Sequence, residues 1–360
     1  MGKTIILTGG GTAGHVTPNM ALIPLLLEDG WTIHYIGSHQ GIEKELIAQF
    51  PQVTYHGVSS GKLRRYLDLK NLSDPFKVIA GAFQARRLVG QIKPQVIFSK
   101  GGFVSVPVVW AGHSRRVPVV VHESDITPGL ANKLAIPLCQ RVCTTFPEAA
   151  RAVGEKGVCT GSPIRPSLYA GSRARGLAFT GLPGRLPVLL IMGGSLGAQA
   201  INQAVDGCLE RLTERYEVIH LRGKGGLNPE LEGRRNYVQY EYIQQELPDL
   251  LAASDLILSR AGANAIWEFA ALHKPMLLVP LPLSASRGDQ ILNAESFVKL
   301  GYARSLEQEK MTPDTLPDAL ATLWANRDTI TAAQQAGDTR GGLKRLLAEI
   351  YRAAGLPPAQ

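Results

Sequence analysis

The 360-residue chain has few cysteines and no long hydrophobic run. Its four cysteines include no Cys-x-x-Cys pair, which argues against a zinc site or a disulfide framework and fits a reducing cytoplasm. The longest apolar run, 20–27, contains Pro24 and is far shorter than the roughly 20 residues that a membrane-spanning helix needs. The first residues lead into a glycine cluster without the layout of a signal peptide. We therefore expect a globular protein, and its length favours two domains.

Basic side chains outnumber acidic ones, 38 to 30, and the excess is concentrated in one half. Residues 1–163 carry a net charge of +7 and residues 164–360 a net charge of +1. The densest basic stretch, 62–87, also contains apolar side chains, a mixture that favours binding to an anionic membrane surface. A solvated loop and helix would show the same pattern. We expect no nucleic acid partner, because the chain has no Arg-rich tail, zinc finger or RNP-like motif.

Both halves repeat one local pattern, a short buried strand followed by a glycine turn and a helix. The strand at 3–8 precedes the turn Gly9–Gly14, and the strand at 187–192 precedes the turn Gly193–Gly197. Further strands are expected at 31–36, 96–99, 117–121, 141–145, 216–221, 237–242, 255–259 and 275–279. Strands that alternate with helices predict an α/β fold of two Rossmann-like, doubly wound parallel-sheet domains, 1–163 and 164–342, with a cleft between them.

Three glycine turns each precede a predicted helix: Gly9–Gly14, Gly101–Ser105 and Gly193–Gly197. Such a turn presents backbone N–H groups at the positive end of the helix dipole, which favours a phosphate or a diphosphate. Tight packing of a helix on a strand explains any single glycine turn equally well. Three in one chain indicate more than one phosphorylated ligand, and Gly10, Gly11, Gly101, Gly102 and Ser105 are the candidates for binding one diphosphate, which the resemblance described below implies to be that of the acceptor.

The first turn also matches the fingerprint of dinucleotide-binding proteins. That interpretation needs a carboxylate at the end of the second strand to bind the ribose, but this strand runs into Gly37-Ser38-His39-Gln40. An NAD(P) oxidoreductase is therefore a remote alternative. The order Lys100-Gly101-Gly102 is the reverse of that in a P-loop, and no Asp-x-Asp sequence offers ligands for a metal. We expect no cofactor, with helix ends and arginines neutralising a leaving diphosphate.

Six segments resemble, in order, the motifs of the MurG family of glycosyltransferases. They are Gly9–Pro18, Lys100–Pro107, His122–Lys133, Gly193–Ala198, Ser259–Glu268 and Asp289–Ala294. The segment Ser59–Tyr66 is most similar to the Gram-positive branch. The resemblance implies a GT-B fold with the acceptor in the first domain, UDP-GlcNAc in the second, and a last helix, about 343–360, packed back on the first domain.

The implied reaction is inverting transfer of GlcNAc from UDP-GlcNAc to the 4-hydroxyl of lipid I, undecaprenyl-pyrophosphoryl-MurNAc-pentapeptide, to give lipid II in peptidoglycan synthesis. The resemblance places the protein at the cytoplasmic face of the cell membrane as a peripheral protein and links it to cell wall biogenesis, cell shape and cell division. A related GT-B lipid glycosyltransferase and a UDP-GlcNAc 2-epimerase are the alternatives. The membrane patch is predicted at Lys62, Arg64, Arg65, Phe76 and Phe83.

The resemblance also implies which residues bind the substrates. They are Thr12, Ala13, Gly14, Asp125, Arg165, Ser195, Ile243, Ala263, Asn264, Ala265, Ile266, Trp267, Glu268 and Gln290. Arg165 and Ser195 would contact the UDP diphosphate, and the Glu268 carboxylate would accept from the ribose hydroxyls. The chain departs from many members of the family at Asp125, where they have Asn, and at Ala13, where they have Gly.

The acceptor hydroxyl must lose a proton as it attacks, so the site needs a base. His15, just after the first glycine turn, is the first candidate, although a histidine there can also cap the helix or bind phosphate. Asp125 and Glu123 are the other candidates, and Glu123 could equally be a buried structural acid. Arg260, directly after a strand, could bind the donor phosphate or pair with an acid.

Overall fold

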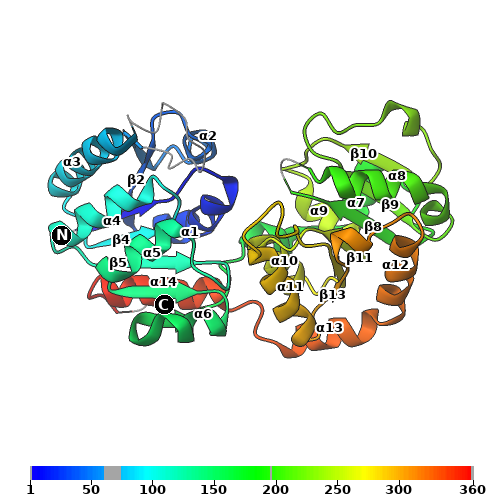
Figure 1. Ribbon diagram of the computed structural model, residues 1–360. Helices are drawn as coiled ribbons and strands as arrows, with labels where there is room; N and C mark the ends of the chain where they lie inside the picture. The colour runs from blue at the N-terminus through cyan, green and yellow to red at the C-terminus, as the bar shows by residue number, and fades with distance from the viewer. Residues whose placement is uncertain (1, 61–73, 195–196, 358–360) are drawn as a thin grey trace. The chain divides into compact units, whose positions relative to one another are not determined.

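The computed structural model divides the chain into two compact units (Figure 1). Unit 1 comprises Met1–Arg165 and Arg340–Gln360, and unit 2 comprises Pro166–Thr339. The structure describes residues 2–60, 74–194 and 197–357, except the side chains of 74–77. The sequence-based boundaries, 163/164 and 342/343, fall near these divisions, and the cleft expected between the domains stays a prediction.

Unit 1 is built on a parallel sheet with the strand order β3-β2-β1-β4-β5-β6-β7 in the described part of the chain. The strands are β1 (Lys3–Thr8), β2 (Trp31–Ser38), β3 (Thr54–Val58), β4 (Val96–Ser99), β5 (Val119–Glu123), β6 (Arg141–Thr144) and β7 (Gly157–Cys159). The central strands β1, β4 and β5 are almost wholly buried, as expected for parallel strands that helices cover on both faces.

The helices of unit 1 cover both faces of this sheet (Figure 1). One face carries α3 (Asp74–Ile92), α4 (Ser105–Ser114) and α5 (Leu130–Ala135), and the other carries α1 (Thr17–Glu28) and α14 (Gly342–Ala353). The remaining helices are η1 (Ala13–His15), α2 (Ile42–Ile47), η3 (Ile136–Leu138), α6 (Pro147–Val153) and η4 (Gly154–Lys156). Pro18 lies in the first turn of α1, where its missing N–H costs no hydrogen bond.

The last helix, α14, is part of the core of unit 1. Leu346 and Ile350 are fully buried in one cluster with the β1 side chains. Trp31 Nε1 donates to Tyr351 Oη at 2.8 Å, and Arg345 Nε donates to the Thr160 carbonyl at 2.7 Å. The helix was expected to reach about residue 360, but it ends at Ala353 because Gly355 and the prolines at 357 and 358 do not continue a helix.

Unit 2 has a second parallel sheet, with the strand order β10-β9-β8-β11-β12-β13 in its described residues. The strands are β8 (Val188–Met192), β9 (Glu217–Leu221), β10 (Tyr237–Tyr240), β11 (Leu256–Ser259), β12 (Met276–Leu278) and β13 (Arg304–Ser305). The helices are η5 (Pro166–Ala170), α7 (Arg173–Thr180), α8 (Gln199–Thr213), η6 (Pro229–Leu231), α9 (Leu247–Ala253), α10 (Ala263–Ala271), α11 (Asp289–Lys299), η7 (Gln308–Lys310), α12 (Thr315–Ala325) and α13 (Arg327–Ala336).

Both sheets have the Rossmann arrangement. In each one the first strand is central, the second and third strands extend to one side, and the fourth lies on the other side. The strand order reverses beside β1 and beside β8, and ligands of doubly wound sheets bind at the carboxyl ends of the strands at such a point. The predicted α/β fold with two Rossmann-like parallel-sheet domains is confirmed. Within the described ranges no helix has the length and hydrophobicity needed to span a bilayer.

Candidate active site

In unit 1 the first two glycine turns lie against each other at the carboxyl edge of the sheet. The neighbouring strands β1 and β4 lead into Gly9–Gly14 and into Lys100–Gly102. The Gly10 N–H donates to the Gly101 carbonyl at 3.3 Å, and a Cβ atom on Gly102 would lie 2.1 Å from the Gly10 carbonyl oxygen. The glycines therefore allow a close approach between two backbones, in addition to any role toward a ligand.

A buried carboxylate supports the first glycine turn. Glu43, on α2, is fully buried, and its carboxylate accepts from the N–H groups of Ser38 at 2.9 Å and Gly11 at 3.2 Å. No carboxylate was expected at the end of the second strand, so the sequence analysis missed this residue. Because Gly11 already donates to Glu43, its N–H is engaged inside the protein rather than presented to a phosphate.

The second glycine turn is also engaged internally. Gly101, Gly102 and Ser105 are buried, and Ser105 Oγ donates to the Gly102 carbonyl at 2.7 Å, which closes the first turn of α4. Gly10 is buried as well, whereas Gly11 and Thr12 are exposed, and Ala13 and Gly14 are half-buried. The assignment of these positions to a diphosphate and to the donor sugar stays a prediction.

Glu123, the last residue of β5, acts as a structural acid in this arrangement. Its side chain is buried, Oε1 accepts from the Asp125 N–H at 3.0 Å, and Oε2 accepts from the Gly129 N–H at 3.0 Å and from Asn132 Nδ2 at 2.9 Å. These bonds shape the loop that carries Asp125. Both carboxylate oxygens are thus occupied, which favours the structural interpretation over a role as base.

His15 lies in η1 at the same edge of the sheet. Burial and the positive charge of Lys100 lower the pKa of His15 to about 4, and the negative charge of Asp125 opposes them. Its Nδ1 atom is buried and has no hydrogen-bond partner within the described residues. The imidazole is therefore neutral near pH 7, the form that can accept a proton.

Lys100 is a second residue that was not predicted to belong to the site. In the sequence it was considered only as part of Lys100-Gly101-Gly102, whose order excludes a P-loop. The Lys100 side chain is buried, and its ammonium donates to Ser124 Oγ, next to Glu123, at 2.5 Å. The position of a lysine directly between a buried strand and a Gly-Gly pair is the signal that could have identified it. Arg165, the last residue of the first segment of unit 1, is half-buried.

In unit 2, the residues assigned to the donor follow the carboxyl ends of neighbouring parallel strands. Ile243 follows β10, residues 263–268 form the start of α10 after β11, and Gln290 lies in the first turn of α11 after β12. Since all these strands are parallel, the residues lie along one edge of one sheet. Ser195, in the turn after β8, lies outside the described residues.

The residues at the start of α10 divide between core and surface. Ile266 and Trp267 are buried, and the Trp267 ring packs edge-on against Phe297 with 5.1 Å between the ring centroids. Their side chains belong to the core, so a nucleotide contact there would involve the backbone. Asn264, Ala265 and Glu268 are half-buried, and Ala263 is buried.

Two further polar side chains stabilise the loop after β12. Gln290 Oε1 accepts from the Leu281 N–H at 3.1 Å. The buried guanidinium of Arg260 donates to the Val279 carbonyl at 3.1 Å and to Gln308 Oε1 at 2.7 Å. Arg260 was expected to bind the donor phosphate or to pair with an acid, but these bonds give it a structural role.

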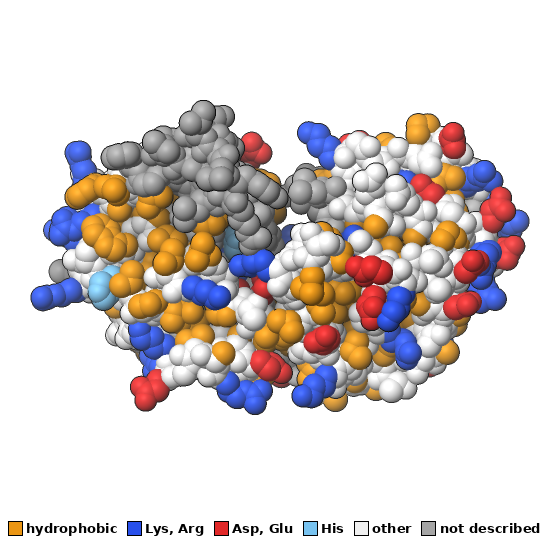
Figure 2. Space-filling view, in the orientation of Figure 1, with side chains coloured by type: hydrophobic (Ala, Val, Ile, Leu, Met, Phe, Trp, Pro, Cys, Tyr) orange, Lys and Arg blue, Asp and Glu red, His pale blue; other side chains and the backbone are white. Residues whose placement is uncertain are grey.

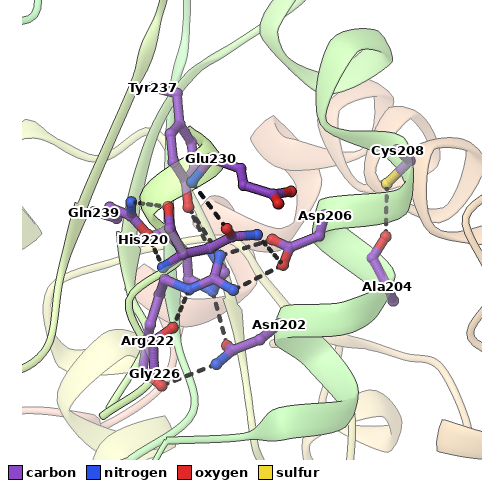
Figure 3. A network of polar contacts seen from close by, with 11 residues as sticks. Asn202, Ala204, Asp206, Cys208, His220, Arg222, Gly226, Glu230, Tyr237 and Gln239 are labelled. Atoms are coloured by element: carbon purple, nitrogen blue, oxygen red, sulfur yellow. Dashed lines mark hydrogen bonds and ion pairs between the residues drawn. The ribbon is translucent and has the colours of Figure 1, made fainter. Parts of the chain in front are cut away.

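A polar network in unit 2 is centred on Arg222 (Figure 3). The Arg222 guanidinium makes two hydrogen bonds to the Asp206 carboxylate, at 2.7 and 2.8 Å, and a third to the Gly226 carbonyl. Asn202 Nδ2 donates to the Arg222 carbonyl at 3.0 Å, and its Oδ1 lies 3.0 Å from His220 Nε2. The Arg222 backbone in turn lies against Gly197. No sequence motif pointed to this network.

Comparisons with known proteins agree with this architecture. Residues 5–144 match the glycosyltransferase family 28 N-terminal domain, and residues 188–346 match the family 28 C-terminal domain. A UDP-N-acetylglucosamine–N-acetylmuramyl-(pentapeptide) pyrophosphoryl-undecaprenol N-acetylglucosamine transferase of Clostridium botulinum (strain Loch Maree / Type A3) is 52% identical over 345 residues, covering 96% of this chain and 97% of the relative. The transferase of the same name from Geobacillus thermodenitrificans is 51% identical, covering 98% of this chain and 100% of the relative.

Among solved structures, the MurG crystal structure from Acinetobacter baumannii superimposes with a TM-score of 0.75 at 24% identity, over 97% of this chain and 99% of that one. A UDP-GlcNAc 2-epimerase from Neisseria meningitidis gives a TM-score of 0.69 at 13% identity, over 97% of this chain and 100% of that one, which shows a shared fold. The two matched domains and the fold make the chain a glycosyltransferase. Its sequence is 51–52% identical to those of the curated transferases over nearly the whole chain, which shows that it belongs to the MurG family, as the motifs predicted.

Proposed function

We propose that this protein transfers GlcNAc from UDP-GlcNAc to lipid I and so forms lipid II. The observation that carries the proposal is identity above 50%, over nearly the whole chain, to transferases whose names state this donor and this acceptor. Unit 1 would bind the acceptor, and unit 2 would bind the donor along the edge that presents Ile243, Glu268 and Gln290.

The chemistry is an in-line displacement with inversion. The acceptor 4-hydroxyl oxygen forms a bond to C1 of GlcNAc, the bond from C1 to the UDP oxygen breaks, and UDP leaves with the electron pair. The hydroxyl proton passes to a base. His15, neutral and unpaired at Nδ1, and Asp125, on the loop that Glu123 holds, are the candidates that the geometry favours.

We expect the reaction to need no bound metal or other cofactor. The start of α10 presents backbone N–H groups without a side-chain cap, and Arg165 adds a guanidinium, so protein groups can neutralise the leaving diphosphate. Within the described residues no group of three or more His, Cys, Asp or Glu side chains is arranged to hold a metal ion. Transfer that persists in EDTA would support this expectation, and transfer that requires an added divalent cation would contradict it.

The helices α3, α4 and α5 offer a surface suited to a membrane. Hydrophobic side chains gather on this face of unit 1 with Lys and Arg near them (Figure 2). The exposed apolar side chains are Ile79, Phe83, Phe103, Trp110, Leu130 and Leu134. Arg86, Arg87 and Arg115 line one shallow pocket with Phe83, and no carboxylate pairs with these arginines in the described part of the chain.

We propose that this surface contacts anionic lipids at the cytoplasmic face of the cell membrane, as a peripheral protein. Of the predicted patch, Phe83 is 64% exposed. Lys62, Arg64 and Arg65 lie outside the described residues, as does the side chain of Phe76. The roles in cell wall biogenesis, cell shape and cell division follow from the proposed product.

The deciding experiment incubates the protein with radiolabelled UDP-GlcNAc and a lipid I analogue. We expect label in the lipid fraction only when both substrates are present. Label that stays water-soluble whatever the acceptor would contradict the proposal, and conversion of the donor sugar without an acceptor would favour an epimerase.

Membrane contact is tested by the double variant Phe83→Asp/Arg115→Glu on vesicles that contain anionic phospholipid. Binding should fall at least about tenfold, since an apolar anchor and a cation are both lost. The matched control is Arg235→Glu, an exposed arginine of unit 2. Equal binding by the double variant and by this control would remove the surface from the proposal.

A further inference from the structure

Lys100 is the most unusual ionisable residue outside the predicted sites. Its side chain is only 2% exposed, although lysine is among the side chains that proteins bury least. It directly follows β4, whose neighbours in the sheet are β1 and β5. Burying an ammonium is costly unless hydrogen bonds and opposite charges compensate, so its surroundings decide its role.

The contacts of Lys100 join three strand ends. Its backbone N–H donates to the Thr8 carbonyl, at the end of β1, at 2.9 Å. Its Cβ lies so close to Gly9 that a Cβ atom added there would be 3.1 Å away. Its ammonium donates to Ser124 Oγ, just beyond β5. One side chain thus links the first glycine turn, the second glycine turn and the segment that carries Asp125.

The charged groups around Lys100 come from each of these strand ends. Burial lowers the pKa of Lys100, and the negative charges of Glu123 and Asp125 partly oppose this shift. Two histidines face the same charge, His15 after β1 and His122 within β5, and in both of them burial and the Lys100 charge lower the pKa. The cluster therefore contains one cation, two carboxylates and two imidazoles that stay neutral.

We propose that Lys100 is a positioning residue of the transfer reaction, which ties the segment Ser124–Asp125 to the two glycine turns of unit 1 and places a buried positive charge beside His15. This inference rests on the proposed function. Lys100 acts through Asp125 and His15, the two candidate bases: it fixes the loop that carries the first, and it disfavours the protonated form of the second.

The test compares Lys100→Met, which keeps the length of the side chain but removes its charge, with Lys100→Arg, which keeps the charge. For Lys100→Met we expect kcat/KM for the lipid I analogue to fall about 10²-fold, because small displacements of reacting groups have effects of that size. The KM for UDP-GlcNAc should change less than about twofold, since Ile243 and residues 263–268, which are assigned to the nucleotide, lie in unit 2. Lys100→Arg should restore most of the activity. Lys44→Met, at an exposed lysine of α2, is the matched control and should behave as the wild type.

The pH dependence distinguishes positioning from mere structural support. Without the Lys100 charge the pKa of His15 rises, so the acid limb of the kcat/KM profile should move to higher pH in Lys100→Met and stay in place in Lys100→Arg. NMR titration of the His15 ring should show the same upward shift without any substrate. Wild-type kcat and an unmoved His15 titration in Lys100→Met would overturn the inference, as would equal losses in both variants with no shift of pH.

If Lys100→Met does not fold, Ser124→Ala decides the question. It removes the acceptor of the ammonium and keeps the charge, so kcat/KM for the acceptor should fall about tenfold with an unmoved acid limb. Wild-type kinetics in Ser124→Ala would then overturn the inference. Absence of label transfer by the wild type would count against the proposed function, whereas the His15 titration would still test the place of Lys100.

Discussion

Replacing Gly102 by alanine tests how closely the two glycine turns of unit 1 constrain each other. Gly102 has a φ of +86°, and an added Cβ would lie 2.1 Å from the Gly10 carbonyl oxygen. Real Cβ contacts are never that short, and the obstructing atom is backbone, so the first glycine turn must move. That turn leads directly into His15.

The loss of stability in Gly102→Ala has two parts, the cost of the backbone conformation and the cost of the steric clash. A side chain in the left-handed region costs roughly 1–2 kcal/mol. Gly30 provides the matched control, because it is exposed in the same unit, its φ is +76° and an added Cβ there would meet nothing within 4 Å. Gly30→Ala should therefore show the conformational cost alone. Gly102→Ala should lose about 3 kcal/mol or more, since it adds the clash or the displacement that relieves it.

Thermal unfolding and steady-state kinetics give the two measurements. For a domain of this size, 1 kcal/mol corresponds to a change in Tm of about 2–4 °C. We expect Gly30→Ala to lower the Tm by about that amount and to retain wild-type kcat/KM. Gly102→Ala should lower the Tm at least about twice as far and reduce kcat/KM for the acceptor about 10²-fold, because the displaced turn carries His15.

The reasoning would be refuted if the two alanine variants had the same Tm and the same activity. That result would mean that Gly10 and Gly102 have room to separate without affecting the site. A lower Tm with unchanged activity would show that the two turns are closely packed but that their displacement does not affect catalysis.

Two further predictions concern buried ionisable groups. His15 has a pKa of about 4 in the folded chain and 6.5 when unfolded, so only the unfolded chain binds a proton between these values, and the contribution of His15 to stability is lost as the pH falls from 6.5 to 4. His15→Gln should remove about 2 kcal/mol of that acid destabilisation in urea titrations at pH 7 and pH 4.5, and an unchanged difference would contradict the assignment. Asp206→Ala leaves the Arg222 guanidinium, 4% exposed, without its carboxylate, and should cost about 3–5 kcal/mol in calorimetry. Asp314→Ala, which affects only an exposed ion pair with Arg211, should cost under about 1 kcal/mol, and equal effects of the two alanine variants would refute this prediction.

The central strands were predictable because their largely apolar sequences indicate burial on both faces of the sheet. The ranges 3–8 and 96–99 matched β1 and β4 to the residue, since each strand is apolar and ends at a polar residue before a glycine turn. The sequence analysis missed β3, β7 and β13. All three are edge strands of their sheets. Two of them, β7 (Gly157–Cys159) and β13 (Arg304–Ser305), are also very short and contain too few apolar residues to show a pattern.

The placement of the predicted site residues along one edge of each sheet was predictable to the same degree, because parallel strands bring their carboxyl ends to one edge. That rule placed His15 beside the loop of Asp125, and Gln290 on the same edge as Ile243. It did not identify Lys100 or Glu43. Charged side chains are usually exposed, and nothing in the local sequence shows that a particular one is buried by partners distant along the chain.

These buried side chains also limit what a glycine turn can reveal about a ligand. In both units a residue that follows the second strand lies against the turn after the first strand: Glu43, after β2, accepts from the Gly11 N–H, and the backbone of Arg222, after β9, lies against Gly197. In unit 1 this support takes the Gly11 N–H, one of the groups that a phosphate would need. A glycine turn therefore predicts anion binding only where its backbone N–H groups are not already hydrogen-bonded within the protein. The N-cap residue of α10, Gly262, makes no side-chain cap bond, so the start of this helix stays a candidate for the donor diphosphate.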